Sequence, residues 1–231
     1  MIISHSHRFI FIKSAKTAGT SIEAALSQFC SGSDVVTPLG NYSVNRDESG
    51  RIAHRAMNAG GYAQHEHGIA IKNSLPDEVW RNYFKFSIAR NPWDRVLSLF
   101  FWKGRNDPAL IDAQKRRVAG SPGSRIDQVR SVRLLFAQFV KDGKWQTNDR
   151  FYILDGELCT DYIVRYEDLG EDLAKVCASI NLPTLELPHL KAGIRERDRH
   201  YSEYYDPETK AIVEARHAND IRYFGYRFEK A

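Results

Sequence analysis

The sequence predicts an α/β fold: a parallel β-sheet of the P-loop type, flanked by helices, in a single domain over residues 1–231. Short apolar runs alternate along the chain with longer stretches in which apolar residues recur every three or four positions. Such alternation of strands and helices favours a parallel sheet, because each helix carries the chain back to the same edge. A small polar turn directly after the first apolar run is typical of an anion-binding loop.

The first strand is expected at residues 8–13 and the first helix at residues 20–30. The turn between them reads Lys-Ser-Ala-Lys-Thr-Ala-Gly, and it would offer backbone N–H groups, hydroxyls and the positive end of a helix dipole to an anion. It differs from the loop of nucleotide triphosphatases, in which lysine directly follows a glycine, because Lys16 precedes Gly19 here. An ordinary strand-to-helix connection is the structural alternative.

A second strand is expected at residues 84–89, followed by Arg90 and by a helix at residues 92–103. An Asn-Pro pair supplies that helix with a cap and with proline at its first position. Arginine offers a planar fork to a phosphate, and the hydroxyl of Ser98 could add one more donor. The alternative is an arginine that caps the strand and a serine that faces solvent.

The rest of the chain predicts two long loops and several further elements. Residues 30–70 are too many for an idle connection, so we expect a substrate-binding or gating segment there. Residues 104–125 contain several glycines and prolines and are expected to form an exposed loop of the same kind. The remaining elements are expected as helices at 76–82, from 129 to a stop at 143, at 169–180 and from 207, with a strand at 162–165.

Residues 151–155 have a pattern that is also found in magnesium-binding strands. Residues 151–155 resemble the strand that carries a magnesium-binding carboxylate in ATPases. Gly156 follows Asp155 at once, so a hairpin turn through these two residues is the better interpretation. A P-loop kinase would need both that carboxylate and a lysine later in the first loop, and neither pattern is convincing here.

Composition favours a reducing compartment and gives no sign of a metal site. The three cysteines, Cys30, Cys159 and Cys177, show neither a zinc spacing nor a disulfide framework. No apolar run near the N-terminus suits a signal peptide or a membrane span, so we expect a cytoplasmic protein without stable membrane insertion. Eight basic residues between Lys103 and Arg133 could attract an anionic substrate or form a solvated insertion. We expect no nucleic-acid partner, and the oligomeric state is left open.

The two loop motifs together resemble a known family. Residues 16–21 resemble the 5′-phosphosulfate loop of sulfotransferases that use 3′-phosphoadenosine 5′-phosphosulfate (PAPS), and residues 90–95 with Ser98 resemble their 3′-phosphate motif. The resemblance is strongest to the carbohydrate branch, which includes heparan 2-O- and chondroitin-type enzymes and bacterial relatives. Further blocks of similarity extend it from about residue 9 to residue 228: Asp161–Leu169, Pro188–Leu190, Tyr204–Asp206, Asp220–Ile221 and Phe224–Tyr226.

This resemblance implies a PAPS-dependent sulfotransferase that moves a sulfuryl group, without a metal, to an acceptor hydroxyl of a carbohydrate or glycoconjugate, with an anionic glycan as one option. Lys16 would be the catalytic residue that stabilises charge on the leaving phosphate oxygen. His65 and His67 are the candidates for the base, and Glu66 is a weaker one. The implied donor-binding residues are Lys16, Thr17, Ala18, Gly19, Thr20, Ser21, Arg90 and Ser98. The alternatives are a P-loop kinase and a non-catalytic nucleotide-binding protein.

The chain departs from the pattern of this branch in two places. Residues 13–16 read Lys-Ser-Ala-Lys where the branch usually has His-Ile-Pro-Lys, and Lys191 stands where an asparagine usually follows Pro-His-Leu. The missing proline leaves the entry to the loop less rigid. Lys13 is expected to add a second positive charge near the sulfate donor.

Overall fold

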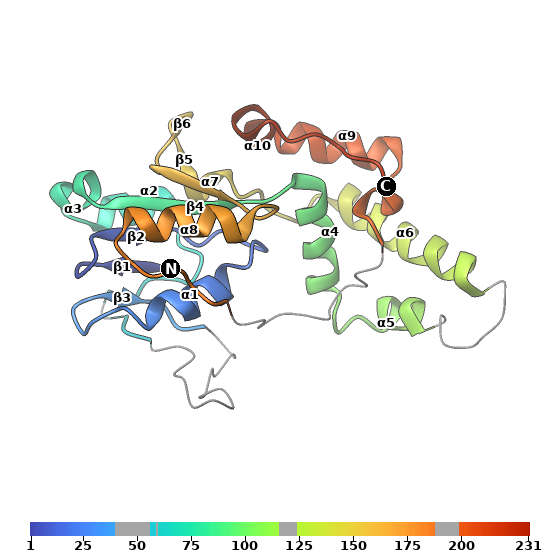
Figure 1. The fold of residues 1–231 in the computed structure, drawn as a ribbon. Helices are drawn as coiled ribbons and strands as arrows, with labels where there is room; N and C mark the ends of the chain where they lie inside the picture. The colour runs from blue at the N-terminus through green and yellow to red at the C-terminus, as the bar shows by residue number, and fades with distance from the viewer. Residues whose placement is uncertain (40–55, 59, 116–123, 188–198) are drawn as a thin grey trace. The chain divides into compact units, whose positions relative to one another are not determined.

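The computed structural model describes residues 1–39, 56–58, 60–115, 124–187 and 199–231 (Figure 1). These residues form two compact units, of which the first comprises 1–90 and 148–190 and the second 91–147 and 191–231. The expectation of a single domain stays a prediction, because two compact units can belong to one domain. The Pro-His-Leu segment and Lys191 lie outside the described residues.

The first unit is built on a five-stranded sheet in the order β3-β1-β2-β4-β7. Strand β2 pairs parallel with β4, and β4 pairs parallel with β7, while β1 runs antiparallel to both of its neighbours. The sheet is therefore mixed: the predicted parallel pairing is present among β2, β4 and β7, and the prediction of a parallel sheet was wrong at the edge formed by β1 and β3. The strands are β1 (Ile2–Ser4), β2 (Phe9–Phe11), β3 (Val35–Val36), β4 (Phe84–Ala89) and β7 (Tyr162–Arg165).

Helices cover both faces of this sheet, as the alternating pattern predicts. On one face, the fully buried rings of Phe11 and Phe86 belong to a core completed by α1 (Gly19–Ser27) and α8 (Leu169–Ser179). Side chains alternate along a strand, so Lys85 points to the other face, where its ammonium lies 5.7 Å from the ring centroid of Trp80 in α3 (Asp77–Asn82). Figure 1 shows α8 in front of β4 and α2 (Gly68–Ser74) behind it.

A separate two-stranded sheet confirms the predicted hairpin. Strands β5 (Ile153–Leu154) and β6 (Glu157–Leu158) pair antiparallel and follow the short helix α7 (Asp149–Tyr152). Asp155 and Gly156 both have positive φ angles, 52° and 84°, as a two-residue hairpin turn requires. Asp155 therefore lies in a turn outside the main sheet.

The second unit is helical and has an aromatic core. Asn91 caps its first helix, since its Oδ1 accepts hydrogen bonds from the N–H groups of Trp93 (3.1 Å) and Asp94 (3.3 Å). The ring centroids of Phe136 and Tyr205 lie 4.9 Å apart in an edge-to-face contact. The elements are α4 (Pro92–Lys103), α5 (Pro108–Lys115), α6 (Ser124–Asp142), a 3₁₀ turn (Tyr201–Tyr204), α9 (Pro207–Arg216) and α10 (Ala218–Phe224).

Helix α5 corrects the expectation of an open loop at 104–125. Proline stands at its first position, and Leu110 and Ala113 are almost completely buried. α5 packs against α6, so tertiary contact stabilises a helix that is too short to be stable alone. Residues 40–55, 59 and 116–123 of the two expected loops lie outside the described residues.

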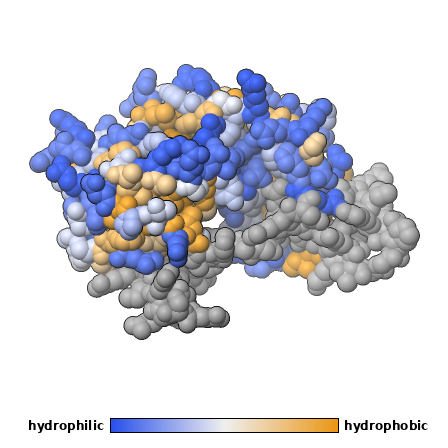
Figure 2. All heavy atoms as spheres, in the orientation of Figure 1, coloured by the Kyte–Doolittle hydropathy of each residue, from blue (hydrophilic) through white to orange (hydrophobic). Residues whose placement is uncertain are grey.

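The apolar residues are largely interior. Hydrophilic residues predominate on the face that Figure 2 shows, with apolar residues visible in smaller areas. Among the described residues, the large apolar side chains that remain exposed are Ile69, Leu134 and Leu158. None of the helices in the described ranges has the length and apolar character needed to cross a membrane.

Candidate functional site

The turn between β2 and α1 has the backbone shape of an anion-binding loop. Lys16 and Ala18 both adopt left-handed conformations, with φ angles of 65° and 59°. The carbonyl of Ala18 accepts hydrogen bonds from the N–H groups of Ser21 (2.9 Å) and Ile22 (3.3 Å), so α1 begins directly after the turn. Backbone concavities of this kind and the positive end of a helix both attract anions. The geometry therefore suits the role that the sequence predicts for residues 16–21.

Hydroxyl groups hold the turn from inside. Ser14 donates from Oγ to the carbonyl of Ile88 in β4 (2.5 Å), and its Oγ lies 2.8 Å from Oγ1 of Thr17. Thr17 is fully buried, while Lys16 and Ser21 are half-buried. The hydroxyl of Thr17 therefore holds the loop together, and the backbone N–H is the group of this residue that could face a ligand.

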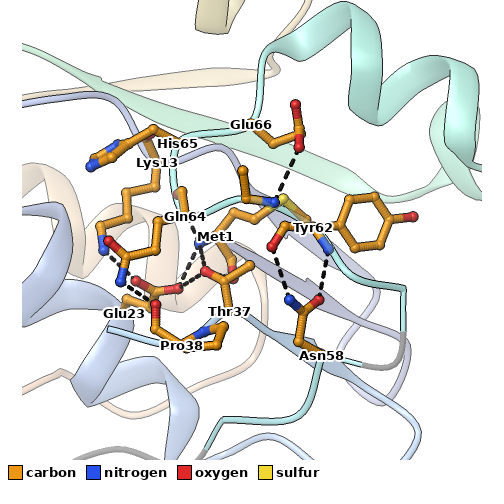
Figure 3. Close-up of polar contacts among 11 residues, drawn as sticks. Met1, Lys13, Glu23, Thr37, Pro38, Asn58, Tyr62, Gln64, His65 and Glu66 are labelled. Carbon is orange, nitrogen blue, oxygen red and sulfur yellow. Dashed lines mark hydrogen bonds and ion pairs between the residues drawn. The ribbon is translucent and has the colours of Figure 1, made fainter. Parts of the chain in front are cut away.

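Lys13 is placed differently from the expectation that it adds charge near the donor. Its ammonium is buried and lies 2.5 Å from Oε2 of Glu23, a fully buried residue of α1 (Figure 3). Oε1 of Glu23 lies 2.5 Å from both the amino group of Met1 and Oγ1 of Thr37. Burial disfavours a charged Glu23, but the Met1 and Lys13 charges outweigh this effect and lower its pKa. The expectation about Lys13 was wrong because the ion pair with Glu23 directs its side chain beneath α1.

Glycine at position 19 makes room for this arrangement. A Cβ atom built on Gly19 would lie 2.8 Å from Cγ of Lys13, closer than real Cβ contacts. The aliphatic part of Lys13 thus passes directly below the first turn of the helix. The small residue in the motif serves the packing of the loop as well as the approach of a ligand.

Arg90 ends β4 beside the loop. Its NH1 atom donates to the main-chain oxygen of Lys16 (2.8 Å), and its guanidinium carbon lies 4.0 Å from the ring centroid of Tyr166, the residue after β7. Three neighbouring parallel strands, β2, β4 and β7, therefore bring the loop, Arg90 and Tyr166 together at their carboxyl ends. Ser98 lies half-buried in α4 of the second unit, and its pairing with Arg90 stays a prediction.

The structure brings His65 to the entry of the loop. Nδ1 of His65 lies 3.0 Å from the main-chain oxygen of Lys13. A carbonyl oxygen can only accept, so Nδ1 carries the proton, and Nε2 is the nitrogen with a lone pair in the neutral ring. The ring centroids of His65 and His67 lie 6.2 Å and 5.7 Å from that of Phe151 in α7. Both predicted histidines therefore flank one buried aromatic ring.

Among the three candidate bases, His67 is exposed, whereas His65 and Glu66 are half-buried. His67 is the N-cap residue of α2. The carboxylate of Glu66 accepts hydrogen bonds from the main-chain N–H groups of Ala63 (3.1 Å) and His67 (3.3 Å). These contacts engage the Glu66 carboxylate within its own turn.

Asn148 is a residue near the loop that sequence reasoning missed. Its Oδ1 accepts a hydrogen bond from the N–H of Ala15 (3.2 Å), and its Nδ2 donates to the carbonyl of Ala15 (2.9 Å). Asn148 is almost completely buried. It lies 133 residues after Ala15 along the chain. The only sequence signal at Asn148 is its position directly before the Asp-Arg-Phe-Tyr segment, and that position suggests a helix cap and not a contact with the loop.

A model of the sulfotransferase family matches residues 1–227. The chain belongs to the sulfotransferase family. As a sulfotransferase it is a transferase of sulfuryl groups, and a hydroxyl-bearing acceptor is implied in general. An uncharacterized protein of Archaeoglobus fulgidus is 27% identical over 121 residues, which cover 49% of this sulfotransferase and 80% of that relative. No solved structure shows a significant match.

The described residues of this sulfotransferase contain no cluster of three or more histidine, cysteine, aspartate or glutamate side chains suited to a metal ion. At the loop, Arg90 donates to the main-chain oxygen of Lys16, and α1 begins directly after the turn.

Proposed function

We propose that this sulfotransferase uses PAPS as its sulfuryl donor and transfers the group to a hydroxyl of a carbohydrate or glycoconjugate. The observation that carries the proposal is the turn in which the left-handed residues Lys16 and Ala18 lead directly into α1, with Arg90 bonded to the same turn. A PAPS molecule has a phosphosulfate that fits the turn and a 3′-phosphate that needs a second cationic group. The proposal includes a cytoplasmic location and a place among bacterial-type members of the carbohydrate branch.

The loop residues would hold the donor. The backbone N–H groups of residues 17–21 would bind the 5′-phosphate, and Lys16 would offset the charge that builds on the bridging oxygen. Arg90 and Ser98 would hold the 3′-phosphate. The contact of the Arg90 guanidinium with the Tyr166 ring, 4.0 Å from the ring centroid, supports this role because it restricts the side chain that would bind the phosphate.

His65 is the base that the geometry favours. Its Nδ1 bond to the oxygen of Lys13 leaves Nε2 as the proton acceptor. In the transfer the acceptor's O–H proton moves to Nε2 while the acceptor oxygen forms a bond to sulfur. The bond from sulfur to the phosphate oxygen breaks, and its electron pair leaves with the phosphate next to Lys16. His67 would act on acceptor binding.

The kinase alternative has less support. The carboxylate that a kinase would use, Asp155, lies in the turn of the β5-β6 hairpin and not at the end of a main-sheet strand. Lys16 also lies before the glycine of the loop, where it differs from the lysine of nucleotide triphosphatases.

Calorimetry with three nucleotides tests the donor assignment. We expect the product nucleotide, 3′-phosphoadenosine 5′-phosphate, to bind at least tenfold more tightly than AMP or ATP. Equal affinity for AMP would remove the 3′-phosphate site from the proposal. A transfer assay with labelled PAPS against panels of glycans, lipids and phenols then tests the acceptor class, and transfer to phenols alone would contradict a carbohydrate acceptor.

A further inference from the structure

We propose that Asn148 is a positioning residue that holds the donor loop in its binding-competent shape. The inference rests on the proposed function, because it assigns Asn148 to the loop that would bind the donor. The side-chain amide of Asn148 forms two hydrogen bonds to a single residue of that loop, accepting from the N–H of Ala15 and donating to its carbonyl. Asn148 itself would not contact the donor.

The loop needs such a support because its backbone is strained. Lys16 and Ala18 occupy the left-handed region without being glycine, and such residues persist only where the surroundings determine their conformation. Asn148 forms hydrogen bonds to Ala15, the residue directly before Lys16. Arg90 donates a hydrogen bond to the main-chain oxygen of Lys16 itself. Together these contacts hold the N–H and carbonyl of Ala15 and the carbonyl of Lys16, where the strained turn begins.

The side chain of Asn148 has no structural task in its own helix. Asn148 is the N-cap residue of α7, yet its side chain makes no capping hydrogen bond there. Removing the amide would therefore not remove a capping hydrogen bond from the start of α7. The buried amide is directed at Ala15 instead, so its loss should act mainly on the loop.

α7 also links the two halves of the candidate site. It begins after Asn148, which holds the donor loop, and it contains Phe151, the ring that His65 and His67 flank. A shift of the loop relative to α7 would move the donor relative to the base. Asn148 is thus placed to keep the donor loop in register with the histidine pair.

Asn58 provides a matched control. Its Nδ2 donates to the carbonyl of Tyr62 (2.8 Å), and its Oδ1 accepts from the N–H of Tyr62 (3.0 Å) (Figure 3). This is the same pair of side-chain bonds to one backbone residue, in a segment that is not part of the donor loop. Asn58→Ala and Asn148→Ala therefore remove equal numbers of hydrogen bonds. They differ in the residue that loses them, which is Tyr62 in the first variant and Ala15 of the donor loop in the second.

The test compares these variants by calorimetry with 3′-phosphoadenosine 5′-phosphate, by thermal unfolding, and by hydrogen exchange of the peptide that covers residues 9–21. Asn148→Ala should weaken nucleotide binding about tenfold and speed exchange at residues 14–18 at least severalfold. Asn58→Ala should leave both within about twofold. Asn148→Leu keeps the shape of the side chain but loses both hydrogen bonds without adding a charge, so faster exchange in this variant separates hydrogen bonding from packing.

Each other outcome has a definite meaning. Unchanged exchange and affinity in Asn148→Ala would overturn the inference, as would equal effects of Asn58→Ala on the donor loop. If Asn148→Leu exchanges like the wild type, Asn148 acts by packing and the positioning role through hydrogen bonds is wrong. A wild-type protein that binds no nucleotide would contradict the proposed function, and the exchange measurement would still decide whether Asn148 holds the loop.

Discussion

The imidazole of His65 is held by the main chain of Lys13: Nδ1 lies 3.0 Å from the Lys13 carbonyl oxygen. The side chain of the same lysine is anchored 2.5 Å from Glu23 beneath α1. One residue just after β2 thus connects a buried ion pair to the candidate base. The orientation of the base depends on how firmly this strand end is held, and the predictions below begin there.

Glu23→Gln should destabilise the fold strongly. It leaves the buried Lys13 ammonium without its carboxylate, and breaking a buried ion pair from one side typically costs about 3–5 kcal/mol. Urea denaturation measures the free energy of unfolding. Asp77→Asn is the control, because it breaks the exposed pair with Arg81 (2.8 Å) and should change stability by less than about 1 kcal/mol. Similar losses in both variants would show that the buried pair has no special weight.

The same pair should give a pH-dependent difference between wild type and Glu23→Gln. The pKa of Glu23 is lowered in the folded protein by the Met1 and Lys13 charges, although burial opposes this. Its stabilising contribution is therefore complete above the unfolded pKa of about 4.3 and is lost as the pH falls through the lower folded value. The stability difference between the two proteins should shrink as unfolding is measured from pH 7 down to pH 3. A difference that stays constant over this range would contradict the lowered pKa.

Lys16→Ala should abolish transfer without harming the fold. Removing a charged contact to the transition state commonly costs about a hundredfold or more in rate. The half-buried side chain contributes little packing, and alanine bears the same left-handed strain as lysine. Steady-state rates and thermal unfolding measure the two effects. The control is Lys175→Ala, an exposed lysine of α8, which should keep full activity. Near-normal turnover of Lys16→Ala would exclude Lys16 as the leaving-group residue.

His65→Ala and His67→Ala should have different kinetic effects, the first on turnover and the second on acceptor binding. The loss of a general base typically costs about a hundredfold to ten-thousandfold in turnover, and we expect this for His65 with nucleotide affinity unchanged. The pH–rate profile of that variant should also lose its acidic limb. His67→Ala should raise KM for the acceptor more than it lowers kcat, because its ring is exposed, whereas the ring of His65 contacts the loop entry at Lys13. If both variants and the double variant keep full activity, the base lies elsewhere and Glu66 is the next residue to test.

Arg90→Lys should weaken binding of the product nucleotide and leave binding of AMP nearly unchanged. Lysine keeps the charge but loses the planar fork and the close contact of the guanidinium with the Tyr166 ring. We expect the affinity for 3′-phosphoadenosine 5′-phosphate to fall about tenfold, with AMP affinity changed less than about twofold. Calorimetry with both nucleotides measures this. An equal loss for both would mean that Arg90 acts through the Lys16 carbonyl and shapes the loop, without binding the 3′-phosphate.

The elements that depend on local pattern were predictable from the sequence. Strand β4 and helix α4 have the predicted bounds, since an apolar run, an Asn cap and a proline at the first helical position are all neighbours in the chain. The hairpin turn at Asp155 and Gly156 was predictable for the same reason. The positions of residues 16–21 and of Arg90 directly after two strands were also predictable, and their role in binding an anion stays a prediction.

Tertiary structure alone decided the roles of residues whose partners are distant in sequence. Lys13 became a buried structural cation because α1 places Glu23 below the loop, and Asn148 reached Ala15 from 133 residues away. The antiparallel pairing of β1 and the helix α5 likewise rest on contacts that no local pattern announces. The sequence by itself therefore determined where the loop and its cations lie along the chain. Packing determined which of those charges is buried and which residues hold the loop, because burial and hydrogen-bond partners exist only once the strands have come together.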